Sequence, residues 1–366
     1  MEVPFSYLKR QFANPDAILE EIRHWIVKGT FTLGEPVERF ERAFAELIGV
    51  KHAIAVGSGT DALFLSLKAM GIGAGDEVIT AVNTFVATAG AIETSGARIR
   101  FVDCDSRFVM DPEQLEAAVT PRTKAIIPVH YTGQPADMDA IEAIARKHGL
   151  AVIEDACTAI DGSYRGRRCG AMGRTAAFSL HPLKNLNVWG DGGLITTGDD
   201  DLMEKLKLLR NHGMRNRDVY EFYAYNSRLD TIQAVVGLHL IKEAHAITER
   251  RIAIAQCYDR AFRECPGLTV PPRSTEERHV YHLYIIQSDR RDALLKHLKA
   301  KGISAKIHYP IPLHLQPASA HLGYAKGDFP VAEAQAQSMI SLPAHQHLSQ
   351  AEVDYVIDRV TAFQTT

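Results

Sequence analysis

The stretch HAIAVGSGTDALFLSLKAMG, residues 52–71, is typical of a strand that enters a helix through a tight glycine turn. Its first five residues are mostly apolar and suited to a strand, whereas alanine, leucine and methionine, which favour helices, follow the turn. The same alternation continues with EVITA and TFVATAGAIETSG, RIRFVD and DPEQLEAAV, AIIPV and DMDAIEAIARKHG, and finally LAVIED. Strands that alternate with amphipathic helices predict an α/β fold with a mostly parallel sheet, flanked by helices on both faces.

Two further strand candidates, TAAFSL and GLITT, follow this alternating region. From about residue 230 the sequence becomes helix-rich, and it then predicts a strand at VYHLYIIQS, a helix near 290–301, a strand near 303–308 and a last helix from about 350. A length of 366 residues is typical of roughly two domains. We therefore expect a large α/β domain over residues 1–240 and a smaller α+β domain over residues 241–366, although no Pro- or Gly-rich linker marks the boundary.

The composition is that of an ordinary soluble protein without a nucleic-acid or membrane surface. Hydrophobic residues make up 46% and charged residues 23%, and the formal net charge is −3. The beginning, MEVPFSYLKRQFANPD, lacks an apolar signal segment, and no stretch approaches the roughly 18 apolar residues of a membrane span. The five cysteines, an odd number, show no C-x-x-C spacing. A reducing compartment explains them best, so we expect a cytoplasmic protein.

The turn VGSGTDAL, residues 56–63, is the first candidate site. Backbone N–H groups and the helix dipole at such a turn favour phosphate binding, and the spacing of Gly57, Gly59 and Ala62 also fits the dinucleotide fingerprint. That fingerprint expects an acidic residue at the end of the next strand, but Asp76 and Glu77 precede that strand. A nicotinamide cofactor is therefore disfavoured. Taken alone, the motif is explained equally well as a tight turn without a ligand.

Asp155 and Lys184 are the second and third candidates. Asp155 ends the apolar strand VIEDA, at the sheet edge where α/β folds bind ligands. Taken alone, it is better explained as the cap of a helix or turn. Lys184 lies in FSLHPLKNLNVWGDGG, residues 178–193, after Ser179 and His181 and before a glycine-rich loop. A solvent-exposed loop lysine is the alternative there.

Together the three candidates match the contacts that pyridoxal phosphate requires. A lysine amine binds this cofactor covalently, a helix N-terminus holds its 5′-phosphate, and a buried carboxylate keeps its pyridine nitrogen protonated. With that nitrogen positive, the ring accepts electrons from a carbanion at the substrate Cα. Three signals in the right order favour this cofactor more strongly than any one motif does.

The whole chain resembles the DegT/DnrJ/EryC1/StrS family of pyridoxal-phosphate-dependent sugar aminotransferases, which have the aspartate aminotransferase fold (fold type I). The motifs that carry the resemblance span nearly the whole chain: GSGTDAL, NTFVATAGAI, PVHYTGQPADMDAI, VIEDACTAI, FSLHPLKNL with GDGG, YNSRLDTIQA and HYPIPLHLQ. The resemblance implies that Lys184 is the catalytic residue and carries the cofactor, and that Asp155 pairs with the pyridine nitrogen. It also implies a set of further cofactor contacts: Gly59, Thr60, Asp61 and Ser179 at the phosphate, Phe85 on the ring face, and Asn226 from across a dimer interface.

Two positions depart from the family pattern. Thr158 stands where the family often has a glutamine near the ring hydroxyl of the cofactor, and threonine has a shorter reach. Trp189 replaces a smaller residue, which suggests either core packing or an adjustment to the substrate. For Phe85, a core aromatic is the alternative to stacking on the cofactor. No H-E-x-x-H or paired Cys/His spacing occurs in the sequence, so we expect no metal site.

The resemblance implies a homodimeric transaminase with shared active sites in amino-sugar biosynthesis. Its amino donor is glutamate or glutamine, and its acceptor is a keto sugar, favoured as nucleotide-linked. The segments GDGG and YNSRLD resemble members that act at C3 of the hexose more than those that act at C4, so a 3-keto deoxyhexose is preferred to a 4-keto one. Two alternatives stay open: a dehydratase of the same fold, in which the family replaces the lysine with histidine, and a non-catalytic cofactor-binding regulatory protein.

Overall fold

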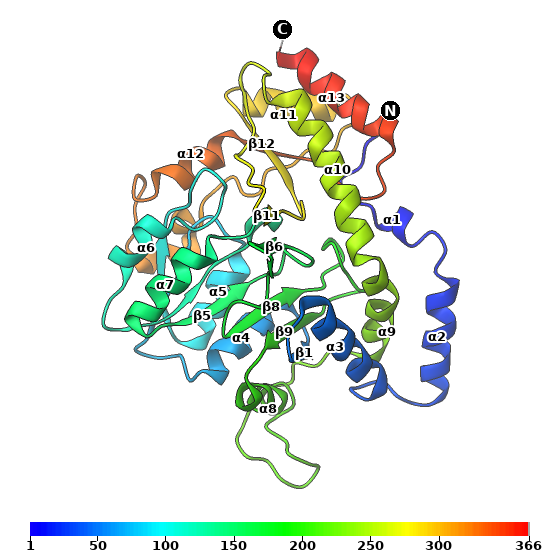
Figure 1. The fold of residues 1–366 in the computed structure, drawn as a ribbon, viewed down its shortest axis with the longest axis vertical. Helices are drawn as coiled ribbons and strands as arrows, with labels where there is room; N and C mark the ends of the chain where they lie inside the picture. Colours follow the sequence, from blue (N-terminus) through cyan, green and yellow to red (C-terminus); the bar gives the residue numbers. More distant parts are fainter. Residues whose placement is uncertain (365–366) are drawn as a thin grey trace.

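The computed structural model describes residues 1–364, and its centre is a seven-stranded sheet (Figure 1). The strands follow the order β1-β9-β8-β5-β4-β2-β3, in which β9 is antiparallel to β1 and β8 and the other neighbours are parallel. Their bounds are β1 His52–Val56, β2 Glu77–Ala81, β3 Arg98–Val102, β4 Thr123–Ile127, β5 Ala151–Asp155, β8 Thr175–Ser179 and β9 Gly193–Thr197. The predicted α/β fold with a mostly parallel sheet is confirmed.

Helices cover both faces of this sheet because successive residues of its apolar strands point to opposite sides. In β1, Ile54 and Val56 enter one core, whereas Ala53 and Ala55 enter another. The first face carries α4 Gly59–Ala69, α5 Val86–Ser95 and α8 Asp200–Leu209. The opposite face carries α2 Asp16–Val27, α3 Glu35–Ile48, α6 Pro112–Ala118, α7 Met138–His148 and α9 Thr231–Leu240.

The C-terminal part has an apolar core of its own. Helix α10 Ala244–Phe262 leads into a three-stranded sheet of β10 Leu268–Thr269, β12 Tyr284–Ser288 and β13 Met339–Leu342, next to α11 Arg291–Ala300 and α13 Gln350–Gln364 (Figure 1). Val3 joins this core and pairs with Ile303, so the start of the chain lies with its end. Apart from short 3-10 helices, the remaining elements of the described chain are α1 Leu8–Gln11, α12 Pro330–Ser338 and a small sheet of β6 Ser163–Tyr164, β7 Arg167–Arg168 and β11 Glu277–Arg278. The domain boundary at residue 240 stays a prediction.

The strand predicted near residues 303–308 is wrong. Within the described chain, this segment makes only single bridges, from Ile303 to Val3 and from Lys306 to Ser341. Because the two bridges go to different partners, no continuous ladder forms. The segment instead leads into His308 and Tyr309, which line the cavity described below.

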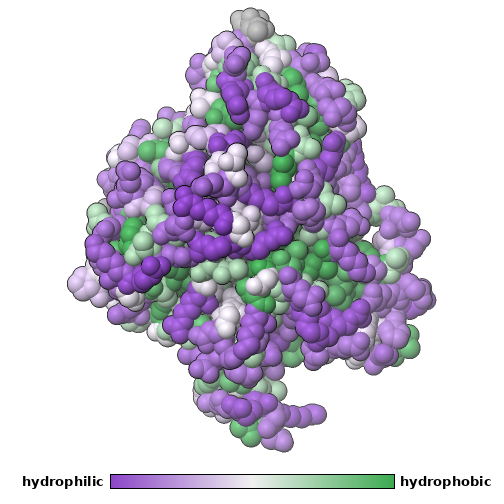
Figure 2. All heavy atoms as spheres, in the orientation of Figure 1, coloured by the Kyte–Doolittle hydropathy of each residue, from purple (hydrophilic) through white to green (hydrophobic). Residues whose placement is uncertain are grey.

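The surface is mainly hydrophilic, with apolar side chains gathered in patches across the middle of the face in view (Figure 2). Three exposed tyrosines, Tyr220, Tyr223 and Tyr225, lie on the loop after α8, which projects from the body of the molecule (Figure 1). No helix within residues 1–364 combines the length and the apolar character that crossing a membrane requires.

Candidate active site

A cavity of about 390 Å³ opens at the carboxyl ends of the parallel strands. Its wall combines the start of α4, the turn between β2 and α5, the end of β5 and the segment after β8. Open α/β sheets bind their ligands at this edge. Seven of the predicted site residues line the cavity: Gly59, Thr60, Phe85, Asp155, Thr158, Ser179 and Lys184.

Helix α4 presents its N-terminus to this cavity. Ser58 caps the helix by accepting a hydrogen bond from the amide of Asp61 at 3.0 Å, and the amides of Gly59 and Thr60 have no acceptor within the helix. A Cβ at Gly59 would lie 2.7 Å from the Ser179 Cβ and 2.9 Å from the Cys157 Sγ, so only glycine fits there. Two free amides at the positive end of a helix dipole form a site for an anion.

Asp61 does not line the cavity. Its amide is engaged by Ser58, and its carboxylate accepts a hydrogen bond from the Ser227 hydroxyl at 2.8 Å. That hydroxyl in turn accepts from the amide of Gly57 at 3.0 Å. Asp61 therefore connects the glycine turn to the end of the projecting loop, and a contact between Asp61 and a phosphate stays a prediction.

Asp155 lies at the end of β5 with 5% of its surface exposed. Its carboxylate accepts a hydrogen bond from the Thr88 hydroxyl at 2.7 Å and one from the amide of Cys157 at 3.2 Å. The second bond is the capping contact that this segment favours when taken alone. In the part of the chain that the structure describes, no cationic side chain forms an ion pair with Asp155. A buried carboxylate at an open cavity is suited to a cationic atom of a ligand.

A buried network behind Asp155 fixes the end of β5. The Nδ1 atom of His130 accepts from the amide of Ala136 at 3.1 Å, so the proton is on Nε2, which donates to Glu154 at 2.9 Å. Glu154 also accepts from the amides of Gly170 and Gly173 at 2.7 and 2.6 Å. Burial opposes the charge of Glu154, but these hydrogen bonds outweigh it and lower the pKa of the carboxyl. Asp155, the next residue, is thereby held in place.

Lys184 lines the cavity from the loop after β8. Its amide donates to the carbonyl of His181 at 2.8 Å, and its own carbonyl accepts from the Tyr7 hydroxyl at 2.6 Å. Burial lowers the pKa of the Lys184 amine, and nearby Cys157 and Asp155 oppose that shift. A lower pKa increases the neutral fraction of the amine, which is its nucleophilic form.

Phe85 and Thr158 complete the predicted part of the wall. The Phe85 side chain is 51% exposed, and its ring lies 5.8 Å from that of Tyr309, so it is not a core aromatic. The Thr158 hydroxyl donates to the carbonyl of His130 at 2.7 Å. Its oxygen therefore remains available to a ligand mainly as an acceptor.

Asn226 is exposed and lies outside the cavity wall, near the base of the projecting loop, where its backbone pairs with that of Asn211. Within one chain, this side chain has no role in the cavity. The position is compatible with the expected contact to a neighbouring subunit, which stays a prediction.

The sequence patterns gave no role to the residues that the C-terminal part adds to the cavity, among them His282, His308 and Tyr309. Burial lowers the pKa of His308 to about 4, and burial beside Asp155 raises the pKa of Tyr309 to about 12. Both side chains are therefore uncharged near neutral pH. They lie far from Lys184 along the chain, and the only signal for them is the segment HYPIPLHLQ, which contributes to the family resemblance.

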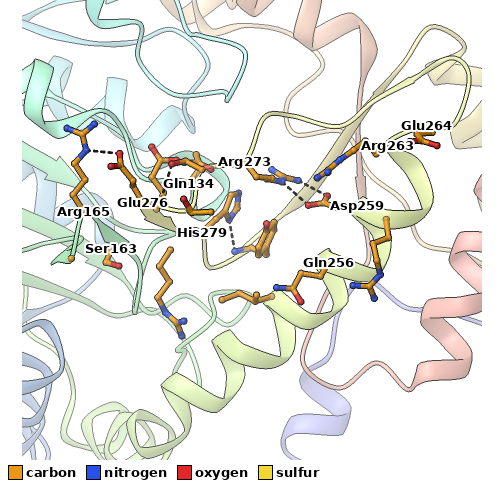
Figure 3. Close-up of a pocket in the computed structure, with 18 residues that line it drawn as sticks. Gln134, Ser163, Arg165, Gln256, Asp259, Arg263, Glu264, Arg273, Glu276 and His279 are labelled. Atoms are coloured by element: carbon orange, nitrogen blue, oxygen red, sulfur yellow. Dashed lines mark hydrogen bonds and ion pairs between the residues drawn. The ribbon is translucent and has the colours of Figure 1, made fainter.

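A larger cavity, about 1150 Å³, lies elsewhere, between α10 and the small sheet with β11 (Figure 3). Several of its charged side chains pair with one another, as in Arg165 with Glu276 at 2.9 Å and Arg273 with Asp259 at 3.1 Å. It contains none of the predicted site residues. We therefore place the chemistry in the smaller cavity at the sheet edge.

The residues of this smaller cavity fit pyridoxal phosphate. The free amides at the start of α4, with the nearby Ser179 hydroxyl, suit a phosphate, and Asp155 suits a protonated pyridine nitrogen. Lys184, with its lowered amine pKa, suits the aldehyde carbon. The cavity thus offers each chemical group of the cofactor a partner of matching chemistry.

Comparison with known proteins agrees with this geometry. The profile described as "DegT/DnrJ/EryC1/StrS aminotransferase family" matches residues 14–361. A "pleiotropic regulatory protein" from Geobacillus stearothermophilus is 43% identical over 99% of both chains. The dTDP-3-amino-3,4,6-trideoxy-alpha-D-glucose transaminase of Streptomyces venezuelae is 41% identical, over 98% of this chain and 95% of its own. The crystal structure of S. venezuelae DesV in complex with a ketimine intermediate superposes with a TM-score of 0.97 at 40% identity, covering 100% of this chain and 99% of that one.

Proposed function

The chain belongs to the DegT/DnrJ/EryC1/StrS aminotransferase family, and from this premise we propose that it aminates the C3 ketone of a nucleotide-linked deoxyhexose in amino-sugar biosynthesis. The enzyme class, a pyridoxal-phosphate-dependent sugar aminotransferase, follows from the family. The observation that carries the proposal is the convergence of Lys184, Asp155 and the start of α4 on one cavity. The preference for C3 is supported by the name of the S. venezuelae transaminase, whose product carries its amino group there.

In this proposal the cavity residues hold the cofactor by the contacts for which they are suited. Bound pyridoxal phosphate supplies an electron sink that stabilises negative charge at the Cα of an amino acid. Asp155, held by Thr88, maintains the positive charge of the ring nitrogen, and the amides of Gly59 and Thr60 hold the phosphate. The Thr158 oxygen accepts from the ring hydroxyl.

Lys184 has two tasks in this scheme. Its amine would hold the cofactor, and as a free amine it would move a proton to or from the substrate Cα. The lowered pKa of the amine helps it to act as the base near neutral pH. Because the donor would leave as its keto acid, with its amino group retained on the enzyme, before the sugar reacts, we expect ping-pong kinetics.

The two alternative functions have less support. A dehydratase of this family has histidine at the position of Lys184, and this chain has lysine. One relative is named a regulatory protein. In this chain, however, the lysine, the carboxylate and the helix N-terminus that a transaminase needs all line one cavity. An absorbance spectrum with an amino donor separates the cases, because a catalytic protein changes its cofactor spectrum on turnover and a binding protein does not.

The amino donor and the compartment are also part of the proposal. We favour glutamate over glutamine as the amino donor. All five cysteines of the chain are free, which supports a reducing compartment such as the cytoplasm.

The position of amination is tested by analysing the product. Incubation with glutamate is expected to convert a 3-keto nucleotide sugar into the corresponding 3-amino sugar and to leave a 4-keto nucleotide sugar unreacted. The bordering segments after Lys184 and around Asn226 shape the way in which the sugar meets the cofactor. NMR of the product assigns the carbon. Amination only at C4 contradicts the C3 proposal and leaves the aminotransferase assignment intact.

We further propose that Asn226 completes the active site of a neighbouring subunit, so that a homodimer is the smallest working unit. The proposal is supported by its exposed position near the base of the projecting loop and by three exposed tyrosines, Tyr220, Tyr223 and Tyr225, on that loop. Asn226→Ala and Lys184→Ala are each expected to be inactive. Mixed and allowed to exchange subunits, they are expected to recover about a quarter of wild-type activity, because half of the dimers are mixed and each has one intact site.

The control for this experiment is a mixture of Lys184→Ala with itself, which cannot form an intact site. Native mass spectrometry verifies that subunits exchange. Full activity of Asn226→Ala alone, or no recovery despite proven exchange, contradicts a role in the partner's site.

A further inference from the structure

A second, smaller cavity of about 80 Å³ adjoins the active-site cavity. The two cavities share Leu183, His282, Leu283 and His308 in their walls. The second one lies between the start of the chain, α10 and the segments on either side of β12 and β13. It is therefore a side chamber of the site proposed above, and its lining indicates what it binds.

Arg251 of α10 lines this side chamber with only 2% of its surface exposed. Its guanidinium donates to neutral oxygens, chiefly the Tyr281 carbonyl at 3.0 Å and the Gln346 side chain at 3.1 Å. Within residues 1–364, no carboxylate forms an ion pair with it; the Tyr7 hydroxyl interacts with the guanidinium, but the Nη2 atom makes no hydrogen bond of regular geometry. A buried positive charge without an anion is costly, and a free donor on it calls for a ligand.

The other polar groups of the side chamber agree with this charge. Lys306 is a second basic side chain of the wall, and no Asp or Glu belongs to it. The Nδ1 atom of His282 is buried without a partner and can donate a hydrogen bond. His345 donates from Nε2 to the carbonyl of Pro4 at 3.1 Å, so its free Nδ1 is an acceptor, suited to a water molecule beside an anion.

We propose that this side chamber binds the distal carboxylate of a dicarboxylic amino donor, with Arg251 as its main partner. The inference rests on the proposed function, because it assigns the donor end of the same site. About 80 Å³ is enough for a carboxylate and a water molecule. A charged carboxylate forms a stronger, bidentate contact with a guanidinium than an amide does, so the chamber selects glutamate over glutamine.

The connection to Lys184 supports the required reach. The Tyr7 hydroxyl donates to the Lys184 carbonyl at 2.6 Å, and the centre of the Tyr7 ring lies 5.3 Å from the Arg251 guanidinium carbon. Leu183, the residue before Lys184, is part of both cavities. The chamber therefore lies beside the segment that carries Lys184, as the proposal requires.

The test compares Arg251→Met with Arg250→Met in the full-length protein loaded with pyridoxal phosphate. Arg250, the neighbouring residue on α10, donates to the Leu348 carbonyl at 2.8 Å and lies outside the chamber wall, so it controls for the loss of an arginine from this helix. The donor half-reaction is followed by absorbance without any sugar, using L-glutamate and L-2-aminobutyrate, which lacks the distal carboxylate. Calorimetric titration with glutarate measures binding independently of turnover.

In Arg251→Met, the ratio of kcat/KM for glutamate to that for aminobutyrate is expected to fall on the order of 100-fold, and glutarate binding is expected to weaken by a similar factor. Arg250→Met is expected to keep both values. A general structural defect would lower both donors alike, so an unchanged ratio in Arg251→Met overturns the inference. A wild-type protein that no amino donor converts contradicts the proposed function instead.

If Arg251→Met does not fold, wild-type titrations decide the question. Glutarate is expected to bind at least about 10-fold more tightly than its monoamide, glutaramate, because only glutarate carries a second charge for Arg251. Equal binding of the two compounds overturns the inference.

Discussion

Replacing Lys184 with alanine is expected to lower amino transfer by at least about 10⁴-fold while the fold is kept. The substitution removes both the amine that binds the cofactor and the base that moves the proton. It leaves the backbone contacts of the loop in place, because these involve the amide and carbonyl of Lys184. Turnover with glutamate and a keto sugar measures the first effect. Thermal unfolding measures the second, with an expected change in Tm of less than about 3 °C.

Lys205→Ala is the matched control, since Lys205 is an exposed lysine of α8 outside the cavity wall. It is expected to behave as the wild type in both measurements. Substantial turnover by Lys184→Ala would show that Lys184 is not the essential catalytic residue. A large decrease of Tm in that variant would show that the Lys184 side chain stabilises the fold, which its position in the loop does not suggest.

Asp155→Asn is expected to reduce turnover by roughly 10²- to 10⁴-fold with a modest loss of stability. Asparagine keeps the shape, its oxygen can still accept from the Cys157 amide and its NH2 group can donate to the Thr88 hydroxyl oxygen, but it carries no charge to hold a proton on the ring nitrogen. Turnover under saturating cofactor is the measurement, so that weaker binding does not mimic slower chemistry.

Asp199→Asn serves as the control for this second prediction. Asp199 likewise accepts from backbone amides, those of Asp201 and Leu202 at 3.0 and 3.1 Å at the start of α8, but it lies outside the cavity wall. It is expected to keep its turnover. If Asp155→Asn also keeps its turnover, Asp155 is only a cap.

The α/β part of the fold could be predicted because its pattern of strands and helices depends on residues that are close together in the sequence. The strands β2, β3 and β4 are each connected to the next strand through a helix, and parallel strands connected in this way leave few arrangements. The segment 303–308 could not be predicted, because its residues have strand character but the chain offers them only single bridges to Val3 and Ser341. Pairing between distant segments is not encoded in a local pattern.

The same distinction applies to the site. Gly59, Asp155 and Lys184 follow strands of one sheet, so the strand order alone brings them together. By contrast, Arg251 and His308 reach the site from the C-terminal part; no local pattern points to Arg251, and the only signal for His308 is the family resemblance of the segment HYPIPLHLQ. Their contribution depends on how two apolar cores pack together.

Trp189 shows how the structure separates two interpretations. Its ring meets that of Phe12 edge-on at 5.6 Å beside the core of the sheet, and its carbonyl accepts from Gln233 at 2.9 Å. It does not line the active-site cavity. Packing therefore explains the large side chain, and a direct effect on the substrate is not required.

The most direct test of the account is to locate the cofactor on the chain. The purified protein, saturated with pyridoxal phosphate, is reduced with borohydride, digested and mapped by mass spectrometry. We predict that the phosphopyridoxyl group is found on Lys184 alone, and that prior incubation with glutamate removes it by converting the cofactor to its amine form. A modification at another lysine, or none at Lys184, would contradict the account.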